Sequence, residues 1–332
     1  MIRAPLRILA CSDAVDLADA ISAELGIERT ASRDVWFACG EGKHIIDDNI
    51  RGTDVYVVQR AVVPGSPRSI YDRFMAVLNA VDAARCADAA RVTVLLPYFP
   101  GGRQDKRKGH VREGVATGLF ARMLTSAGAS MVITVEPHNE AMIGCFPPRD
   151  TVLEPVYLTE TLSAFLLDHG LVGDVVASTD VGGLEMARRF SQRLKCGLVA
   201  MSKERDYGQS SVVTNSVVIG DPAGKRVLII DDIVDTAGSV VSAVHSLWDA
   251  GATDMVIAAP HLLLSGPARS RLAALKVDAD ARGVGLDVVG TSAILHPDAP
   301  PWFHSVAIEP MLAQLIRRVN TRGSIRALER PT

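Results

Sequence analysis

Two adjacent carboxylates and a run of small residues stand together in the segment RVLIIDDIVDTAGS, residues 226–239. Asp231 and Asp232 can accept hydrogen bonds from neighbouring hydroxyl groups of a sugar, or hold a hydrated cation. The turn after them offers short side chains and backbone N–H groups, which favour a phosphate group. Its residues are Asp235, Thr236, Ala237, Gly238 and Ser239. The segment therefore predicts a site for a phosphorylated sugar with free vicinal hydroxyls.

The elements around this segment would place it at the edge of a sheet. The apolar residues 227–230 are typical of a parallel strand covered on both faces, and such strands carry ligands at their carboxyl ends. A helical pattern follows over residues 240–250. Asp235, Thr236 or Ser239 could each be no more than a helix cap. A purely structural role is less expected for Asp231 and Asp232, because burying two adjacent carboxylates without a ligand costs free energy. A nucleotide P-loop is disfavoured because Gly-x-x-x-x-Gly-Lys-Ser/Thr is absent.

Length and composition narrow the class of protein. The chain has 332 residues, 48% hydrophobic and 22% charged, which is typical of two ordinary globular domains. The net charge of −3 lacks the basic field of most nucleic-acid-binding proteins, so we expect no nucleic-acid partner. The five cysteines form no Cys-x-x-Cys pair and have no zinc-site spacing, which favours a reducing cytoplasm. No stretch approaches a membrane span, and we expect no membrane partner.

Alternating apolar runs and amphipathic patterns predict an α/β fold. Strands are expected at residues 6–11, 55–59, 92–98, 131–135, 174–177, 197–201, 212–219, 227–230, 255–260 and 285–290, with a hairpin of strands 35–42 and 43–50. Prolines at 147, 148 and 155 predict a boundary between a domain 1–150 and a domain 151–332. A weak internal repeat indicates duplicated folds, with Gln59 and Arg60 where the second half has its acid pair.

Further motifs connect the whole chain to one family. The chain contains RILACSDAVDLADAISAELG, NIRGTDVYVVQ, PYFPGGRQDKR, VEPHNE, STDVGG and IIDDIVDTAGS. Together these resemble the ribose-phosphate pyrophosphokinases, or phosphoribosyl-pyrophosphate synthetases, whose sugar loop is of the type I phosphoribosyltransferase-like kind. The resemblance implies two similar phosphoribosyltransferase-like domains, each a mostly parallel sheet flanked by helices. ATP would bind on the N-terminal side and ribose 5-phosphate on the C-terminal side, and the last helix could pack on the N-terminal domain.

The resemblance also implies an activity and its partners. Such an enzyme is a ribose-phosphate diphosphokinase, which transfers the β,γ-diphosphoryl group of ATP to the C1 hydroxyl of ribose 5-phosphate with Mg²⁺. The products are phosphoribosyl pyrophosphate and AMP. We further expect a cytoplasmic homo-oligomer built from dimers, with a hexamer as the larger assembly.

Individual residues match the family's motifs. Arg103, Gln104 and Asp105 match its nucleotide-binding loop. His138 matches its catalytic histidine, which contacts an ATP phosphate and the metal ion. Asp180 matches an acidic residue that contacts the metal ion and the ribose phosphate. Lys203 and Arg205 match its catalytic loop, where cations neutralise the transferring phosphoryl group. Phe37, Cys39 and Glu41 match its nucleotide-binding turn. Plainer interpretations remain open: the segment with Arg103 could be a solvated basic loop, His138 a structural histidine, and the segment with Lys203 and Arg205 a connecting loop.

Several positions depart from the family pattern. Cys39 replaces an aspartate that holds the base, and a thiol is a poor acceptor. Ala237 stands where glycine is usual, and we expect it to keep a negative φ. Ser239 stands where threonine is usual. The family has a different sequence, used for subunit contacts, in the region where this chain has QRAVVPGSPRSIYDRFM. Near the C-terminus, Arg326 stands where regulated members of the family have a serine.

These departures leave other functions open. The chain could be a divergent paralogue that uses a modified pentose phosphate or a donor other than ATP. It could also be a regulatory homologue without turnover, although Lys203, Arg205 and His138 argue against that. A phosphoribosyltransferase would share only the sugar loop.

Overall fold

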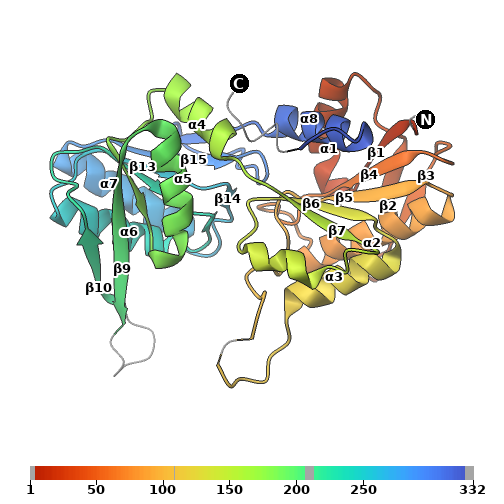
Figure 1. Ribbon diagram of the computed structural model, residues 1–332, viewed down its shortest axis with the longest axis horizontal. Coiled ribbons are helices and arrows are strands. Elements are labelled where there is room, and N and C mark those ends of the chain that lie inside the picture. The colour runs from red at the N-terminus through yellow and green to blue at the C-terminus, as the bar shows by residue number, and fades with distance from the viewer. Residues whose placement is uncertain (1–3, 108, 206–212, 326–332) are drawn as a thin grey trace. The chain divides into compact units, whose positions relative to one another are not determined.

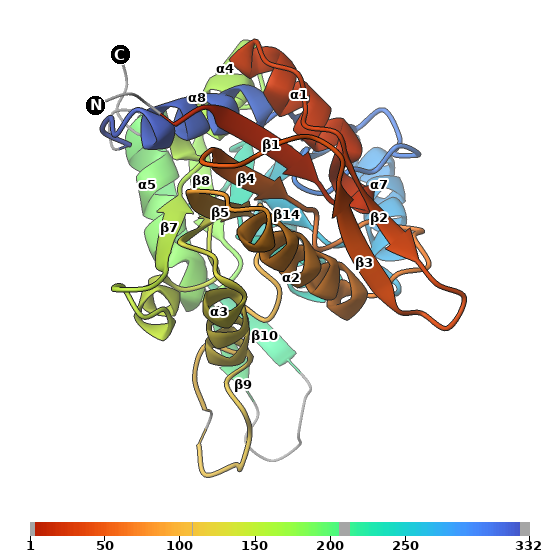
Figure 2. The ribbon, with the colours of Figure 1, turned by 90° about the vertical axis from the view of Figure 1, so that its right-hand side faces the viewer.

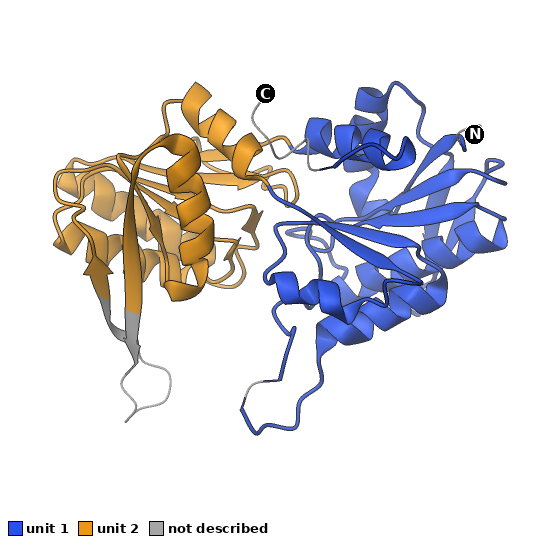
Figure 3. Cartoon of the chain, viewed as in Figure 1, with its two compact units in different colours: residues 1–157, 308–332 blue, residues 158–307 orange. Residues whose placement is uncertain are grey.

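The computed structural model describes residues 4–107, 109–205 and 213–325, with backbone alone for residues 203–205 and 213–216 (Figure 1). The chain divides into two compact units (Figure 3). Unit 1 comprises Met1–Tyr157 and Ile308–Thr332, and unit 2 comprises Leu158–Ala307. Each unit is a sheet flanked by helices, so the predicted α/β class is confirmed. Within the described ranges, no helix is both long enough and apolar enough to span a bilayer.

Unit 1 is built on a five-stranded parallel sheet in the order β1-β4-β5-β6-β7. Its strands are β1 (Leu6–Ala10), β4 (Asp54–Val58), β5 (Arg91–Leu95), β6 (Met131–Val135) and β7 (Val152–Val156). Val55, Tyr56 and Val57 are fully buried, as expected of a strand covered on both faces. The strands follow one another across the sheet in chain order, without a reversal.

Helices cover both faces of this sheet (Figures 1 and 2). They are α1 (Val15–Leu25) and α8 (Glu309–Asn320) on one face, and α2 (Ile70–Cys86) and α3 (Ala116–Ala127) on the other. Helix α8 contacts α1 although it is the last helix of the chain. Its Asn320 Nδ2 donates to Asp54 Oδ2 at 2.8 Å, which fastens the helix to the start of β4.

A β-hairpin stands beside β1. Strands β2 (Ser32–Trp36) and β3 (Gly42–Ile46) are antiparallel and α2 contacts β3. The predicted turn at Gly42 and Lys43 is wrong, because the chain reverses over residues 37–41. Gly40 has φ +93°, a conformation that glycine adopts at little cost, and Phe37 N donates to Glu41 O at 2.8 Å. This closes the hairpin earlier than expected.

Unit 2 is built on a seven-stranded sheet in the order β10-β9-β8-β11-β13-β15-β16. Its strands are β8 (Val175–Ser178), β9 (Gly197–Arg205), β10 (Val213–Ile219), β11 (Val227–Ile230), β13 (Met255–Ala258), β15 (Leu286–Thr291) and β16 (Phe303–Val306). Only β9 and β10 pair antiparallel. From β8 the chain builds outward through β9 and β10, then returns to β11 and builds the other way. The strand order therefore reverses between β8 and β11, where α/β folds bind ligands.

Helices also cover the sheet of unit 2. They are α4 (Thr159–Asp168), α5 (Leu184–Leu194), α6 (Gly238–Asp249) and α7 (Ala268–Arg282). One apolar core joins α6 and α7 to the central strands, and α5 contacts β8, β9 and β11. Strand β9 runs four residues beyond its predicted end at Met201, because β10 pairs with it as far as Arg205. A short parallel pair, β12 (Ile233–Val234) and β14 (His261–Leu262), follows the ends of β11 and β13.

Candidate active site

The acid pair lies at the carboxyl end of β11, where the strand order of unit 2 reverses. Asp231 Oδ2 accepts a hydrogen bond from Thr179 Oγ1 at 2.7 Å, and Asp231 Oδ1 accepts one from Asp232 N at 2.9 Å. Thr179 follows β8, so the two strand ends are joined directly. Burial, together with the charges of Asp232 and Asp180, raises the pKa of Asp231 from 3.8 to about 7. Burial and the neighbouring acids therefore disfavour the ionised form of Asp231.

Asp180 lies at the neighbouring strand end and begins a short turn of 3-10 helix, Val181–Gly183. Its Oδ1 accepts hydrogen bonds from Gly182 N at 2.9 Å and from Gly183 N at 3.2 Å. These bonds fix the carboxylate beside Asp231, whose pKa it helps to raise. Thr179, Asp180, Asp231 and Asp232 thus meet at one edge of the sheet.

The turn that follows β11 leads into α6 through an unusual backbone conformation. Ala237, the residue before the helix, has φ +61° and ψ +3° and is buried. The expected negative φ is wrong. The turn needs a left-handed residue immediately before α6, a conformation that glycine adopts at less cost than alanine. Because the N-cap residue is alanine, its side chain cannot accept a bond from the first N–H groups of α6.

Other contacts hold this turn in place. Ser265 N donates to Asp235 O at 2.9 Å, and Arg271 Nη1 donates to Thr236 O at 2.9 Å. Thr236 and Ser239 are exposed, while Asp235 and Gly238 are half-buried. The turn thus presents small side chains and the start of a helix to solvent, an arrangement that suits a phosphate group.

The arginine loop of unit 1 follows β5. Arg103 and Gln104 are exposed, and Asp105 is half-buried, with its Oδ2 buried and without a hydrogen-bond partner among the described residues. Thr117 at the start of α3 secures the loop: its Oγ1 donates to Gly101 O at 2.9 Å and its N to Gln104 O at 3.3 Å.

The histidine loop follows the adjacent strand, β6. His138 is exposed and precedes a 3-10 helix, Glu140–Cys145. A Cβ placed on Gly102 would lie 3.2 Å from Met142 Sδ in that helix, so the arginine and histidine loops are in contact. Glu136, two residues before His138, is buried with φ +39°, a strained conformation for a glutamate.

The nucleotide-binding turn lies elsewhere in unit 1. Phe37, Cys39 and Glu41 are all exposed at the tip of the β2–β3 hairpin. Figure 2 shows the hairpin extending from the β1 side of the sheet, away from α3 and the loop before it. The segments that follow β5 and β6 thus touch at Gly102 and Met142, whereas this turn lies at a different edge of unit 1.

Lys203 and Arg205 belong to the end of β9, where their backbones pair with Ser216 and Val213 of β10. This segment was expected to be a loop from Ser202 onward, and the structure corrects that for residues 202–205. Residues 206–212 and Arg326 lie outside the described residues.

Sequence reasoning missed two residues of the site in unit 2. Thr179 directly precedes Asp180 in STDVGG, and a hydroxyl at the end of a buried strand was the available signal. Arg271 comes from α7, more than thirty residues after the turn that it supports, and no local pattern marks it.

Comparison with known proteins identifies the family. The N-terminal domain of ribose phosphate pyrophosphokinase matches residues 6–128, and the phosphoribosyl transferase domain matches residues 158–287. The ribose-phosphate pyrophosphokinase of Listeria ivanovii is 32% identical over 327 residues, which cover 97% of this chain and 96% of that protein. The chain belongs to the ribose-phosphate pyrophosphokinase family. The resemblance predicted from the motifs is confirmed.

Other members of the ribose-phosphate pyrophosphokinase family agree in sequence and in structure. The Chlorobaculum tepidum protein of that name is 36% identical over 269 residues, 81% of this chain and 80% of that protein. The crystal structure of phosphoribosylpyrophosphate synthetase from Mycobacterium smegmatis matches with a TM-score of 0.83 at 31% identity, covering 96% of this chain and all of that one. The predicted fold class is therefore confirmed at both levels.

Proposed function

We propose that this chain is a ribose-phosphate diphosphokinase that uses ATP. In this reaction the C1 oxygen of ribose 5-phosphate attacks the β-phosphorus of ATP. The bond from that phosphorus to the oxygen of the α-phosphate breaks, the hydroxyl proton is released, and the products are phosphoribosyl pyrophosphate and AMP. The main support for the proposal is the position of Asp231 and Asp232 in a chain of this family. They lie where the strand order of unit 2 reverses, next to a turn in which Ala237 has a left-handed conformation.

Ribose 5-phosphate would bind to unit 2. Asp231 and Asp232 are acceptors for the 2- and 3-hydroxyl groups of the sugar, and the turn 235–239 receives the 5-phosphate. The raised pKa of Asp231 supports this role, because donors from a sugar would satisfy charge that the protein leaves uncompensated. The sugar would be held by its hydroxyls and phosphate, with its C1 hydroxyl left to react.

ATP would bind to unit 1 through its phosphates. The Arg103 guanidinium can donate to phosphate oxygens, Gln104 and Asp105 extend the same loop, and His138 lies in the adjoining one. The turn with Phe37, Cys39 and Glu41 would hold the base. Since that turn stands at a different edge of unit 1, we infer that it serves the nucleotide site of a neighbouring copy in a homo-oligomer of dimers.

A divalent cation fits the carboxylates of the site. Asp180, Asp231 and Asp232 gather negative charge at one sheet edge, and hard cations such as Mg²⁺ prefer oxygen ligands. Asp180 would be its ligand from unit 2, together with phosphate oxygens. The ion would offset the charge of the triphosphate. Lys203 and Arg205 would neutralise the β-phosphoryl group during transfer.

One incubation tests the proposed function. Purified protein with Mg²⁺, ATP and ribose 5-phosphate should release AMP and phosphoribosyl pyrophosphate in equal amounts, measured by mass spectrometry. Release of AMP without the sugar product, or no AMP at all, would reject the proposal. The Asp231→Asn variant is the control, because it should need about ten times more ribose 5-phosphate for the same AMP release.

A second candidate rests on Cys39. This cysteine is exposed in the hairpin turn at a position where the family has a base-binding aspartate, so the nucleotide donor could differ from ATP. A panel of ATP, GTP, CTP and UTP in the same assay decides between them. Equal or faster turnover with another nucleotide would favour the divergent paralogue.

A further inference from the structure

Two carbonyl groups at the entrance to the turn 235–239 accept hydrogen bonds from the segment before α7. Leu264 N donates to Val234 O at 3.1 Å, and Ser265 N donates to Asp235 O at 2.9 Å. These peptides are trans, and in a trans peptide the C=O group and the N–H group of the next residue point in opposite directions. The N–H groups of these two peptides therefore face away from the segment before α7.

The next carbonyl along the turn is held by a side chain. Arg271 lies in the first turn of α7 and is exposed, and its Nη1 donates to Thr236 O at 2.9 Å. This bond turns the N–H of Ala237 away from the guanidinium group. A Cβ placed on Gly238 would lie 3.4 Å from Arg271 Nη1, so the guanidinium also lies against the first residue of α6. Successive N–H groups held in this way form a concavity that favours anions.

The turn would receive a phosphate group in acidic surroundings. Asp235 lies in the turn and Asp231 and Asp232 precede it, whereas residues 231–239 contain no lysine or arginine. A phosphate monoester carries about −1.5 to −2 charges near pH 7, and the N–H groups at a helix start offer only partial positive charges. Arg271 adds a full positive charge beside them, from a helix outside the motif.

A purely structural role for Arg271 explains less. A hydrogen bond to the carbonyl of an exposed residue contributes about as much free energy as is lost when an arginine side chain is held in one conformation. The bond from Arg271 to Thr236 therefore adds little to the stability of the unliganded unit. With an anion in the turn, the same bond gains value, because the N–H groups that it orients then have an acceptor.

We propose that Arg271 is a positioning residue for the 5-phosphate of the sugar. It fixes the peptide between Thr236 and Ala237 so that the N–H of this peptide faces the phosphate, and it places a positive charge at the start of α6. The inference rests on the proposed function, since its ligand is the ribose 5-phosphate assigned to this turn. Affinity for the phosphorylated sugar then depends on a helix that lies outside the binding motif.

Calorimetry with ribose 5-phosphate alone, and steady-state kinetics with ATP, test this role. Arg271→Met removes the charge and the donor but keeps the length of the side chain. It should raise the Kd and the KM for ribose 5-phosphate about tenfold, with kcat and the KM for ATP changed less than about twofold. Arg271→Lys keeps the charge and one donor, and its Kd should rise no more than about threefold.

Arg269→Met is the matched control. Arg269 lies on the same helix and is exposed, but its Nη2 lies 2.9 Å from His296 Nδ1 and not at the turn. This variant should bind ribose 5-phosphate like the natural chain. A reading that needs no variant is hydrogen exchange of the natural chain, in which ribose 5-phosphate should slow exchange of the amides of residues 235–241.

The outcomes separate this inference from the proposed function. The role of Arg271 is overturned if Arg271→Met binds ribose 5-phosphate like the natural chain, loses affinity for ATP equally, or is not rescued by Arg271→Lys. The same holds if the sugar leaves exchange of residues 235–241 unchanged. In these cases the proposed function stands as long as the natural chain still forms AMP and phosphoribosyl pyrophosphate in equal amounts. A natural chain that does not bind ribose 5-phosphate overturns both.

Discussion

The ends of β4 and β11 occupy comparable places in the two units but differ in how their charges are satisfied. After β4 come Gln59 and Arg60, both buried, and Arg60 Nη1 pairs with Asp16. After β11 come Asp231 and Asp232, where the pKa of Asp231 rises to about 7 because burial and acid neighbours outweigh compensating contacts. One strand end carries a buried arginine that is paired within its unit, whereas at the other burial and neighbouring acids disfavour the ionised form of Asp231.

Topology accounts for the difference. The sheet of unit 1 runs in chain order, and the buried Arg60 that follows β4 pairs with Asp16 of α1 in the same unit. In unit 2 the order reverses between β8 and β11, the position at which α/β folds bind ligands. Related folds thus acquire different roles from the residues at their strand ends.

The largest expected effect is on the turnover number, after replacement of Lys203 at the end of β9 in unit 2. Lys203→Ala should lower kcat about 10²–10³-fold, because it removes a donor that stabilises charge in the transition state. Steady-state kinetics measure this, and thermal unfolding should be unchanged. Lys276→Ala is the control, since that lysine pairs with Asp280 on α7. If both variants turn over like the natural protein, Lys203 has no part in the mechanism.

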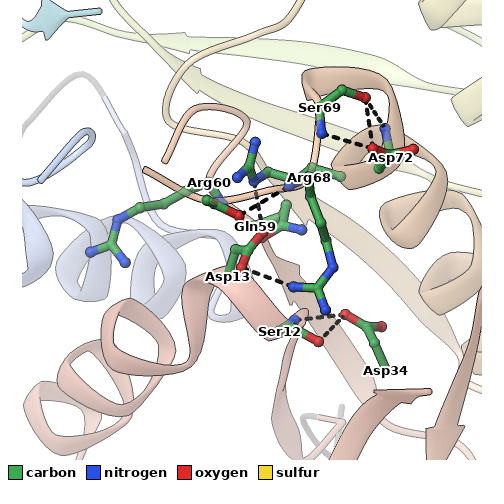
Figure 4. Close-up of polar contacts among 10 residues, drawn as sticks. Ser12, Asp13, Asp34, Gln59, Arg60, Arg68, Ser69 and Asp72 are labelled. Carbon is green, nitrogen blue, oxygen red and sulfur yellow. Dashed lines mark hydrogen bonds and ion pairs between the residues drawn. The ribbon is translucent and has the colours of Figure 1, made fainter. Parts of the chain in front are cut away.

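The ion-pair network at the β1 and β4 ends should be structural. Asp13 accepts hydrogen bonds from Arg73 Nε at 2.7 Å and Arg68 Nη1 at 3.2 Å, and Arg73 is buried (Figure 4). Asp13→Asn should destabilise unit 1 by about 3 kcal/mol, because a buried guanidinium loses its counter-charge. Urea unfolding measures the loss, and hydrogen exchange assigns it to unit 1.

Asp19→Asn is the control for that measurement. Asp19 pairs with Arg29 on the surface, and its side chain is 54% exposed. Its replacement should cost less than about 0.5 kcal/mol. Equal losses in the two variants would show that the buried network contributes nothing beyond an ordinary surface pair.

Replacing an aspartate by asparagine in unit 2, at Asp231, should raise the free energy of unfolding instead of lowering it. The folded-state pKa of Asp231 lies above its unfolded value, so the folded site binds the proton more tightly, and stability is lost as the pH rises from about 4 to 7. Asp231→Asn should therefore stabilise the unliganded protein by about 1–2 kcal/mol at pH 8. The gain should disappear below about pH 4, where aspartate is protonated in both states.

Binding sharpens this test. Asp231→Asn should weaken ribose 5-phosphate binding about tenfold, as expected for the loss of hydrogen bonds to a charged acceptor. ATP affinity should change less. Calorimetry with each ligand measures both, and a larger loss for ATP would contradict the assignment of the sugar to unit 2. A destabilised variant at pH 8 would show that the carboxylate is structural.

Residues next to strand ends were accessible from the sequence, whereas conformations set by tertiary contacts were not. The acid pair and Asp180 follow short apolar runs, so local patterns placed them at one sheet edge, and they meet there. The hairpin turn was misplaced because Gly40, and not Gly42, adopts positive φ. Arg271 lies on α7, and only the packing of α7 against α6 brings it to the turn before α6.

The smallest expected effect concerns the strained backbone of Ala237, the residue before α6 in unit 2. Ala237 has φ +61°, which costs an alanine about 1–2 kcal/mol relative to glycine. Its methyl is buried, and removing it costs about 0.8 kcal/mol. Ala237→Gly should therefore stabilise the protein by about 0.5 kcal/mol in urea unfolding. Ala243→Gly, at a buried helical position of α6, should instead destabilise by about 2 kcal/mol. If Ala237→Gly costs as much as Ala243→Gly, the turn does not hold alanine in a strained conformation.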